Sequence, residues 1–139
     1  MKNKGLQTEW CLLQAQFDSY EKHSLYIKLI SILVLVAAEL FSEANPLIIL
    51  ILMILWLQDG IWKTFQSRIE TRLLVVEQNI KNHINNNSEV NGFQFNSQFL
   101  ESRLTGVSLI SEYVRQSLRP TVAFPHIALI FIVLFQYLF

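Results

Sequence analysis

The sequence is poor in the residues that mark a soluble domain or a disulfide framework. Only 16% of its 139 residues are charged, whereas 52% are hydrophobic, and soluble domains of this length rarely carry so little charge. Cys11 is the only cysteine, so neither an intrachain disulfide nor a cysteine-based zinc site can form. The 11 basic residues balance 11 acidic ones, so no charge excess points to nucleic acid as a partner.

Catalytic motifs are absent as well. We find no phosphate-binding glycine loop, no HExxH or GxSxG motif, and no His and carboxylate residues clustered at ligand spacing. His23, His83 and His126 lie far apart in the chain. We therefore expect a protein that is not an enzyme and that holds no cofactor and no metal.

What the sequence does contain is three long apolar runs, at residues 25–42, 46–62 and 121–139. Each is close to the roughly 20 residues that a helix needs to cross a hydrocarbon core about 30 Å thick. The first run does not suit a cleaved signal peptide, because mixed residues precede it and a second run follows directly. The sequence predicts an all-α integral membrane protein with three transmembrane helices.

The distribution of positive charge predicts the orientation. The turn at 43–45 has no lysine or arginine, whereas segments 1–24 and 63–119 hold ten of the eleven. Because basic residues avoid the outer side of short loops, we expect both segments to be cytoplasmic in a bacterial inner membrane. Arg119 would then lie at the inner headgroups. The final run, about 28 Å long as a helix, would cross and place the C-terminus outside.

Three amphipathic stretches predict a helical bundle on the cytoplasmic side. Apolar residues recur at helical spacing on one face of each: Leu6, Trp10, Leu13, Phe17 and Tyr20; Ile61, Phe65, Ile69, Leu73, Val76, Ile80 and Ile84; and Leu100, Leu104, Val107, Val114 and Leu118. We expect each face to pack on another helix, of the same chain or of a second copy. The alternative for the first stretch is docking on lipid, since Trp10, Phe17 and Lys22 suit a membrane surface.

The predicted organisation has four segments. They are a cytoplasmic amphipathic helix at 1–24, a transmembrane hairpin at 25–62, a cytoplasmic helical region at 63–119 and a third transmembrane helix at 120–139. The second span is expected to begin abruptly at Pro46, behind a natural N-cap at Asn45, and to continue as one helix to about Ile84.

Four ionisable residues, Lys28, Glu39, Asp59 and His126, lie in or beside the apolar runs. Burying a charge in a membrane costs at least about 3 kcal/mol, so such residues are functional candidates. With Ala44 at the apex of the hairpin, Lys28 and Asp59 come level near the inner interface. We expect an intramembrane ion pair between them, or else two side chains that snorkel independently. Glu39, close to the apex, is expected at the outer interface.

His126 follows Pro125, which should free a backbone carbonyl and bend the third span. A structural role would be a hydrogen bond to a neighbouring helix or to the freed carbonyl. A functional role would be a pore-lining or proton-sensing group, because histidine changes its charge near neutral pH. In either role we expect the ring to face protein or a cavity, since hydrocarbon would leave a ring nitrogen without a partner.

The segment WLQDGIWKTFQSRIETRL, after the second span, resembles the FWYLDAYYLRQERLF-type junction of a group of small bacterial membrane proteins. Trp56, Asp59 and Trp62 match that junction in kind, and Arg68 and Arg72 follow. The tyrosine pair and the Arg-Gln-Glu-Arg run are missing. The group combines a hairpin, a helical cytoplasmic part and a late third span. It has no assigned activity, so the resemblance implies no site residues.

In plan alone, residues 10–85 resemble the two-span SLATT effectors of bacterial nucleotide-signalling and antiphage systems, from which the third span departs. We therefore expect first an oligomeric membrane protein that forms a pore or perturbs the bilayer as a bacterial defence effector. The alternative is a non-catalytic accessory or scaffold subunit of a larger membrane complex. The expected partners are the lipid bilayer and either further copies of the chain or an unlike membrane subunit.

Overall fold

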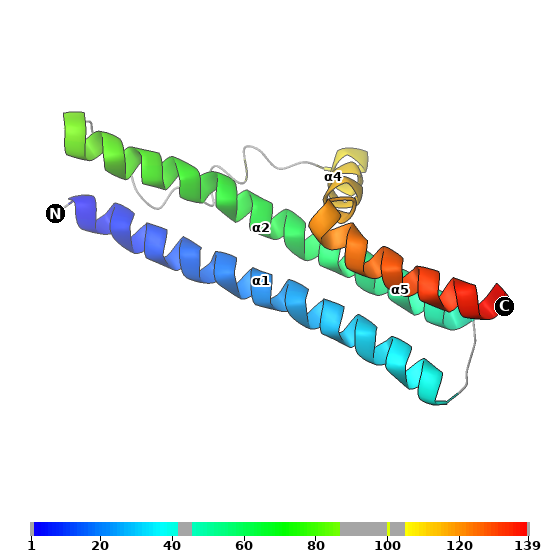
Figure 1. Cartoon of the computed structure of the whole chain (residues 1–139). Helices are drawn as coiled ribbons and strands as arrows, with labels where there is room; N and C mark the ends of the chain where they lie inside the picture. The colour runs from blue at the N-terminus through cyan, green and yellow to red at the C-terminus, as the bar shows by residue number, and fades with distance from the viewer. Residues whose placement is uncertain (1, 42–45, 87–99, 101–104, 139) are drawn as a thin grey trace.

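The computed structural model describes residues 2–41, 46–86, 100 and 105–138 of the chain, and in these ranges every regular element is helical. The helices are α1 (Lys2–Leu40), α2 (Pro46–Asn86), α4 (Val107–Ser117) and α5 (Pro120–Leu138). Figure 1 shows α1 and α2 as two long antiparallel helices, with α5 along one half of the pair and α4 joined to the start of α5.

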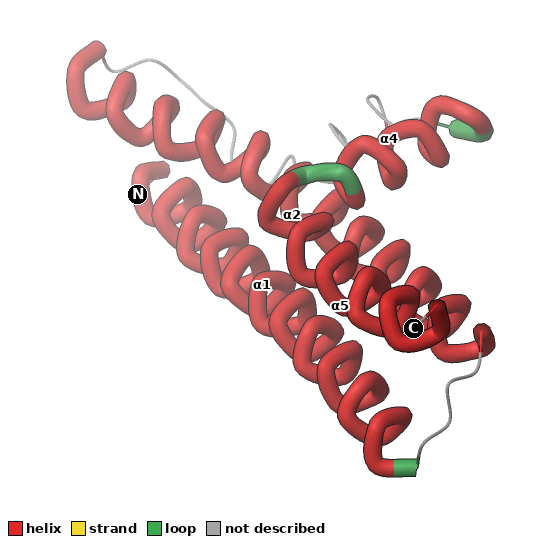
Figure 2. Tube along the Cα trace, turned by 45° about the vertical axis from the view of Figure 1, so that its right-hand side comes forward, coloured by secondary structure: helices red, strands yellow, loops and turns green. Residues whose placement is uncertain are grey.

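The two long helices are about twice as long as a bilayer core is thick. α1 has 39 residues and α2 has 41, so each rises about 60 Å, against a core of about 30 Å. Together with the 19 residues of α5, they are three helices long and apolar enough to cross a membrane. The prediction of three helices that are long and apolar enough to span a membrane is therefore confirmed. The other half of α1 and α2 extends beyond α5 (Figure 2).

We call this projecting half, residues 2–20 of α1 and 65–86 of α2, the arm. Its core consists of Leu6, Leu13, Ile69 and Val76, with Trp10, Phe17, Tyr20, Leu73 and Ile80 packed against it. The two predicted apolar stripes thus face each other within one chain. Burial of each large aliphatic side chain contributes roughly 1.5–3 kcal/mol. Since the N-terminal stripe is covered by α2, its alternative assignment to a lipid surface is not supported.

The other half is a three-helix unit, formed by α1, α2 and α5, and each of the three helices contributes to its core. Leu35 of α1, Leu52 of α2 and Val133 of α5 are buried together. The outward faces of the same helices carry exposed apolar side chains: Leu29, Leu33, Leu50, Ile54, Phe131 and Phe135. Exposed apolar side chains on three neighbouring helices suit contact with lipid.

The helix boundaries follow the sequence signals in two places. α2 begins at Pro46 and runs without a break to Asn86, while the proposed cap Asn45 lies outside the described residues. α5 begins at Pro120 and continues through Pro125 as a single helix, so the bend at Pro125 stays a prediction. His23 lies within α1 and stacks on Trp62, with ring centroids 5.0 Å apart.

The third apolar stripe does not pack on another helix within the part of this chain that the structure describes, so its packing on a second copy stays a prediction. Val107, Val114 and Leu118 of that stripe are 82%, 45% and 61% exposed, and Leu104 lies outside the described residues. α4 contacts α2 through its polar face instead, where Glu112 accepts a 2.8 Å hydrogen bond from Arg68. The opposing face of α2 offers an arginine and a glycine, so an ion pair and a close backbone approach decide which side of α4 docks.

Candidate functional site

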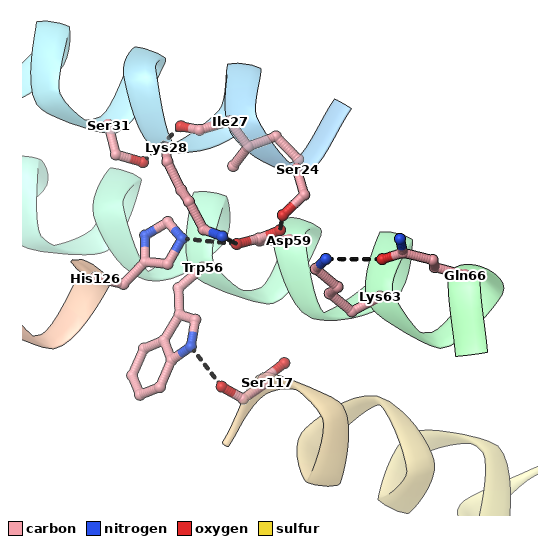
Figure 3. Close-up of polar contacts among 10 residues, drawn as sticks. All are labelled: Ser24, Ile27, Lys28, Ser31, Trp56, Asp59, Lys63, Gln66, Ser117 and His126. Carbon is pink, nitrogen blue, oxygen red and sulfur yellow. Dashed lines mark hydrogen bonds and ion pairs between the residues drawn. The ribbon is translucent and has the colours of Figure 1, made fainter. Parts of the chain in front are cut away.

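The most concentrated polar site lies where the hairpin meets α5, around the carboxylate of Asp59 on α2. Its side chain is fully buried. Lys28 Nζ of α1 lies 3.7 Å from Oδ2, and His126 Nε2 of α5 lies 3.3 Å from the same oxygen. Ser24 of α1 donates a hydrogen bond to Oδ1 (Figure 3). One carboxylate therefore joins α1, α2 and α5.

The positions of these residues explain why they converge. Ser24 and Lys28 are four residues apart, so both lie on the face of α1 that meets α2. In the hairpin Lys28 lies level with Asp59, as predicted from their similar separations in sequence from the apex. His126 lies in the second turn of α5, at the end of that helix nearest the arm. Ser31 lies one turn beyond Lys28, and its hydroxyl donates a 2.9 Å hydrogen bond to the Ile27 carbonyl of the same helix.

The cluster compensates an otherwise costly burial. An isolated ionised carboxylate in an apolar interior is strongly unfavourable, unless it is paired and hydrogen-bonded. Asp59 has both kinds of compensation, because Lys28 supplies the positive charge, and Ser24 and His126 supply further hydrogen-bond donors. The Lys28 side chain remains 22% exposed, so its ammonium lies at the edge of the packed interior. Removing the carboxylate would leave Lys28, Ser24 and His126 without their shared partner.

His126 is enclosed by protein and is fully buried. Its ring lies nearly parallel to that of Trp56, with an interplanar angle of 15° and centroids 6.5 Å apart. In the tautomer that carries its proton on Nε2, the ring donates to Asp59. Nδ1 then has no hydrogen-bond partner among the residues that the structure describes. The hydrogen bond thus goes to a neighbouring helix and not to the carbonyl freed by Pro125.

A second set of contacts fixes the end of α4 beside the same site. Trp56 Nε1 donates a 2.9 Å hydrogen bond to the Ser117 carbonyl. A Cβ at Gly60 would stand 1.8 Å from Ser117 Oγ and 3.2 Å from Ser117 Cα, so only glycine allows this approach. Thr64, one turn further, is buried and donates to the Gly60 carbonyl at 2.9 Å. Trp56 thereby connects the ring of His126 with the chain segment leading into α5.

Sequence reasoning singled out Lys28, Asp59 and His126, and the structure brings all three together. It missed Ser24 and Gly60. Ser24 carried a usable signal, since it precedes Lys28 by one helical turn, but an isolated serine is too common to stand out. Nothing in the sequence indicated that Gly60 would meet α4. Glu39 takes no part in the cluster and is exposed in the last turn of α1.

The arrangement is suited to holding α1, α2 and α5 together through one carboxylate. In the described ranges, no group of three or more His, Cys, Asp or Glu side chains could hold a metal ion. None of the family models, curated proteins or solved structures compared with the chain matches it. The function must therefore be argued from this geometry.

Proposed function

We propose that this chain is a non-catalytic scaffold or accessory subunit of a membrane complex, anchored in a bacterial inner membrane by three spans. The observation that supports it is the inward orientation of the polar groups in the spans. Lys28 and His126 each contact Asp59 inside a single chain, and apolar side chains lie on the outside. Helices of this kind anchor a protein, whereas a water-filled path needs polar groups on a shared face.

The arm supplies the surface outside the membrane on which a scaffold could bind another subunit. It is roughly 30 Å long at helical rise and has a core separate from that of the three-helix unit. Its two helices are tied by a buried pair, in which Arg72 and Glu9 approach to 2.8 Å. Leu12 and Leu74 are 61% and 58% exposed on its surface. A rigid projecting rod with exposed apolar residues is suited to docking an unlike subunit on the cytoplasmic side.

Purification of the tagged full-length chain from native membranes in mild detergent tests this proposal. We expect an unlike protein in a fixed ratio to the chain. Leu12→Gln and Leu74→Gln should release this partner, because they remove apolar contact area from the arm. Lys81→Gln serves as the matched control on an exposed position of the same arm. Recovery of the chain alone, or only in rings of identical copies, would contradict the scaffold proposal.

A second candidate is an oligomeric pore that acts as a defence effector, and one observation favours it. Charged groups buried within a membrane protein are expensive and mark functional sites by default. If α5 left the hairpin, Lys28, Asp59 and His126 would become available to line a path shared between copies. The alternative thus requires an opening of the three-helix unit.

Ion flux through liposomes that carry the purified protein tests this second candidate. Flux that rises or falls between about pH 5 and 8, and a flattened response in His126→Ala, would support a gate at His126. Absence of flux at every pH and membrane potential would end the pore proposal. Flux with the same pH profile in both proteins would support a pore but would show that His126 does not gate it.

A further inference from the structure

We propose that a pocket between α1 and α2 binds the phosphate of an anionic phospholipid headgroup. The pocket has a volume of about 260 Å³ and opens to the surface beside the Asp59 cluster. It is lined by Glu21, Lys22, Ser24, Leu25, Lys28 and Lys63. This site has no part in the scaffold proposal and depends only on the membrane location of the three spans.

The charges around the pocket favour an anion. Three lysines line it against one carboxylate, that of Glu21. Lys28 is already paired with the buried Asp59, and Figure 3 shows Lys63 directed to Gln66, whose neutral oxygen it contacts at 2.7 Å. Lys28 and Lys63 both line the pocket, so their like charges repel each other there. A phosphate between the ammonium groups would relieve this repulsion.

The surroundings of the pocket indicate a lipid rather than a free phosphate. Tyr20 and Trp62 lie on the arm side of the pocket with ring centroids 5.3 Å apart, and both residue types are enriched at membrane surfaces. On the other side, Leu25 and Leu29 of α1 are 53% and 52% exposed and lead into the apolar span. A bound lipid would therefore place its phosphate among the lysines and its acyl chains along Leu29. Basic pockets at this depth are typical headgroup sites.

Lipid binding to the purified full-length chain in detergent tests the proposal, with bound lipids counted by native mass spectrometry. We expect phosphatidylglycerol to bind more tightly than phosphatidylcholine. Each lysine near a headgroup is worth roughly a fivefold change in affinity. Lys63→Gln should therefore weaken phosphatidylglycerol binding about fivefold, and Lys22→Gln with Lys63→Gln about 25-fold, by the same estimate. Lys63→Arg should retain binding, which separates loss of charge from loss of fold.

Two controls make the result decisive. Lys81→Gln carries the same charge change on α2, far from the pocket, and should bind like the wild type. Glycerol 3-phosphate and inorganic phosphate supply the anion without acyl chains and should bind far more weakly. Equal binding of the two lipids, or an equal loss in Lys81→Gln, would overturn the proposal. Soluble phosphates binding as tightly as the lipid would also overturn it, by assigning the pocket to a free ligand. None of these outcomes depends on whether an unlike subunit exists.

Discussion

Two buried charge clusters lie on the same pair of helices, and they are built in different ways. In the arm, Arg72 Nε and a terminal guanidinium nitrogen lie 2.9 and 2.8 Å from one oxygen of Glu9, and both side chains are at most 5% exposed. At the junction with α5, Asp59 is contacted by an ammonium, a hydroxyl and an imidazole from two further helices.

The difference separates a fixed element from a responsive one. The guanidinium of Arg72 is always charged and lies among the apolar residues of the arm core, so it sets the register of two helices permanently. At the junction, by contrast, the Lys28 side chain has access to the surface. The arm is therefore expected to stay rigid. The contact of α5 with the hairpin is expected to depend on the lipid surroundings.

Arg72→Ala should produce the largest loss of stability. It leaves the buried carboxylate of Glu9 without the guanidinium and should cost about 4 kcal/mol, the range for breaking a buried ion pair. Replacing both residues, in Glu9→Leu with Arg72→Met, should be close to neutral, because the apolar pair fits the surrounding core. Denaturant unfolding in micelles, followed by circular dichroism, measures both. A single-variant loss below about 1 kcal/mol would show that the pair is not buried in the membrane-bound protein.

Asp59→Ala should cost less, about 3 kcal/mol, because Lys28 can move towards the headgroups when its partner is lost. The exchange of charges in Lys28→Asp with Asp59→Lys should recover only part of this loss, since Ser24 and His126 would then face an ammonium. The same unfolding assay applies. If the exchanged variant is no more stable than either single variant, Lys28 and Asp59 do not interact.

Gly60→Ala should have an intermediate effect, about 1–3 kcal/mol, because its Cβ would collide with Ser117 and push α4 from α2. Faster hydrogen exchange in α4, with unchanged exchange in the arm, is the expected signature. Adding Ser117→Gly removes the colliding side chain and should restore part of the protection. Wild-type exchange in α4 of Gly60→Ala would contradict the close approach.

Arg68→Ala should have the smallest effect. The Arg68 and Glu112 side chains are 19% and 22% exposed, so water screens their pairing and its contribution should be below about 1 kcal/mol. Unfolding in low and high salt measures it, and we expect the small loss to shrink with salt. A loss as large as that of Arg72→Ala would erase the distinction between exposed and buried pairs on α2.

The parts of this fold that could be predicted are those determined by local pattern. The lengths of the apolar runs predicted three helices able to span a membrane, and the recurrence of Ile69, Leu73 and Val76 at steps of four and three residues predicted the face of α2 that α1 covers. The number of residues between each side chain and the apex of the hairpin placed Lys28 level with Asp59. The docking of α4 could not be predicted, because a close backbone approach at Gly60 outweighed its apolar stripe. The meeting of His126 with Asp59 depends on how α5 lies against the hairpin, which no local pattern encodes.

The most direct test of the central claim, that Asp59 joins α5 to the hairpin through His126, is a double-mutant cycle. Asp59→Asn and His126→Ala are compared singly and together for their free energies of unfolding in micelles. A hydrogen bond to a charged group predicts a coupling energy of about 1.5–3 kcal/mol, so the double variant should lose clearly less than the sum of the singles. Losses that add within about 0.5 kcal/mol would show that the two side chains act independently, and would contradict the account.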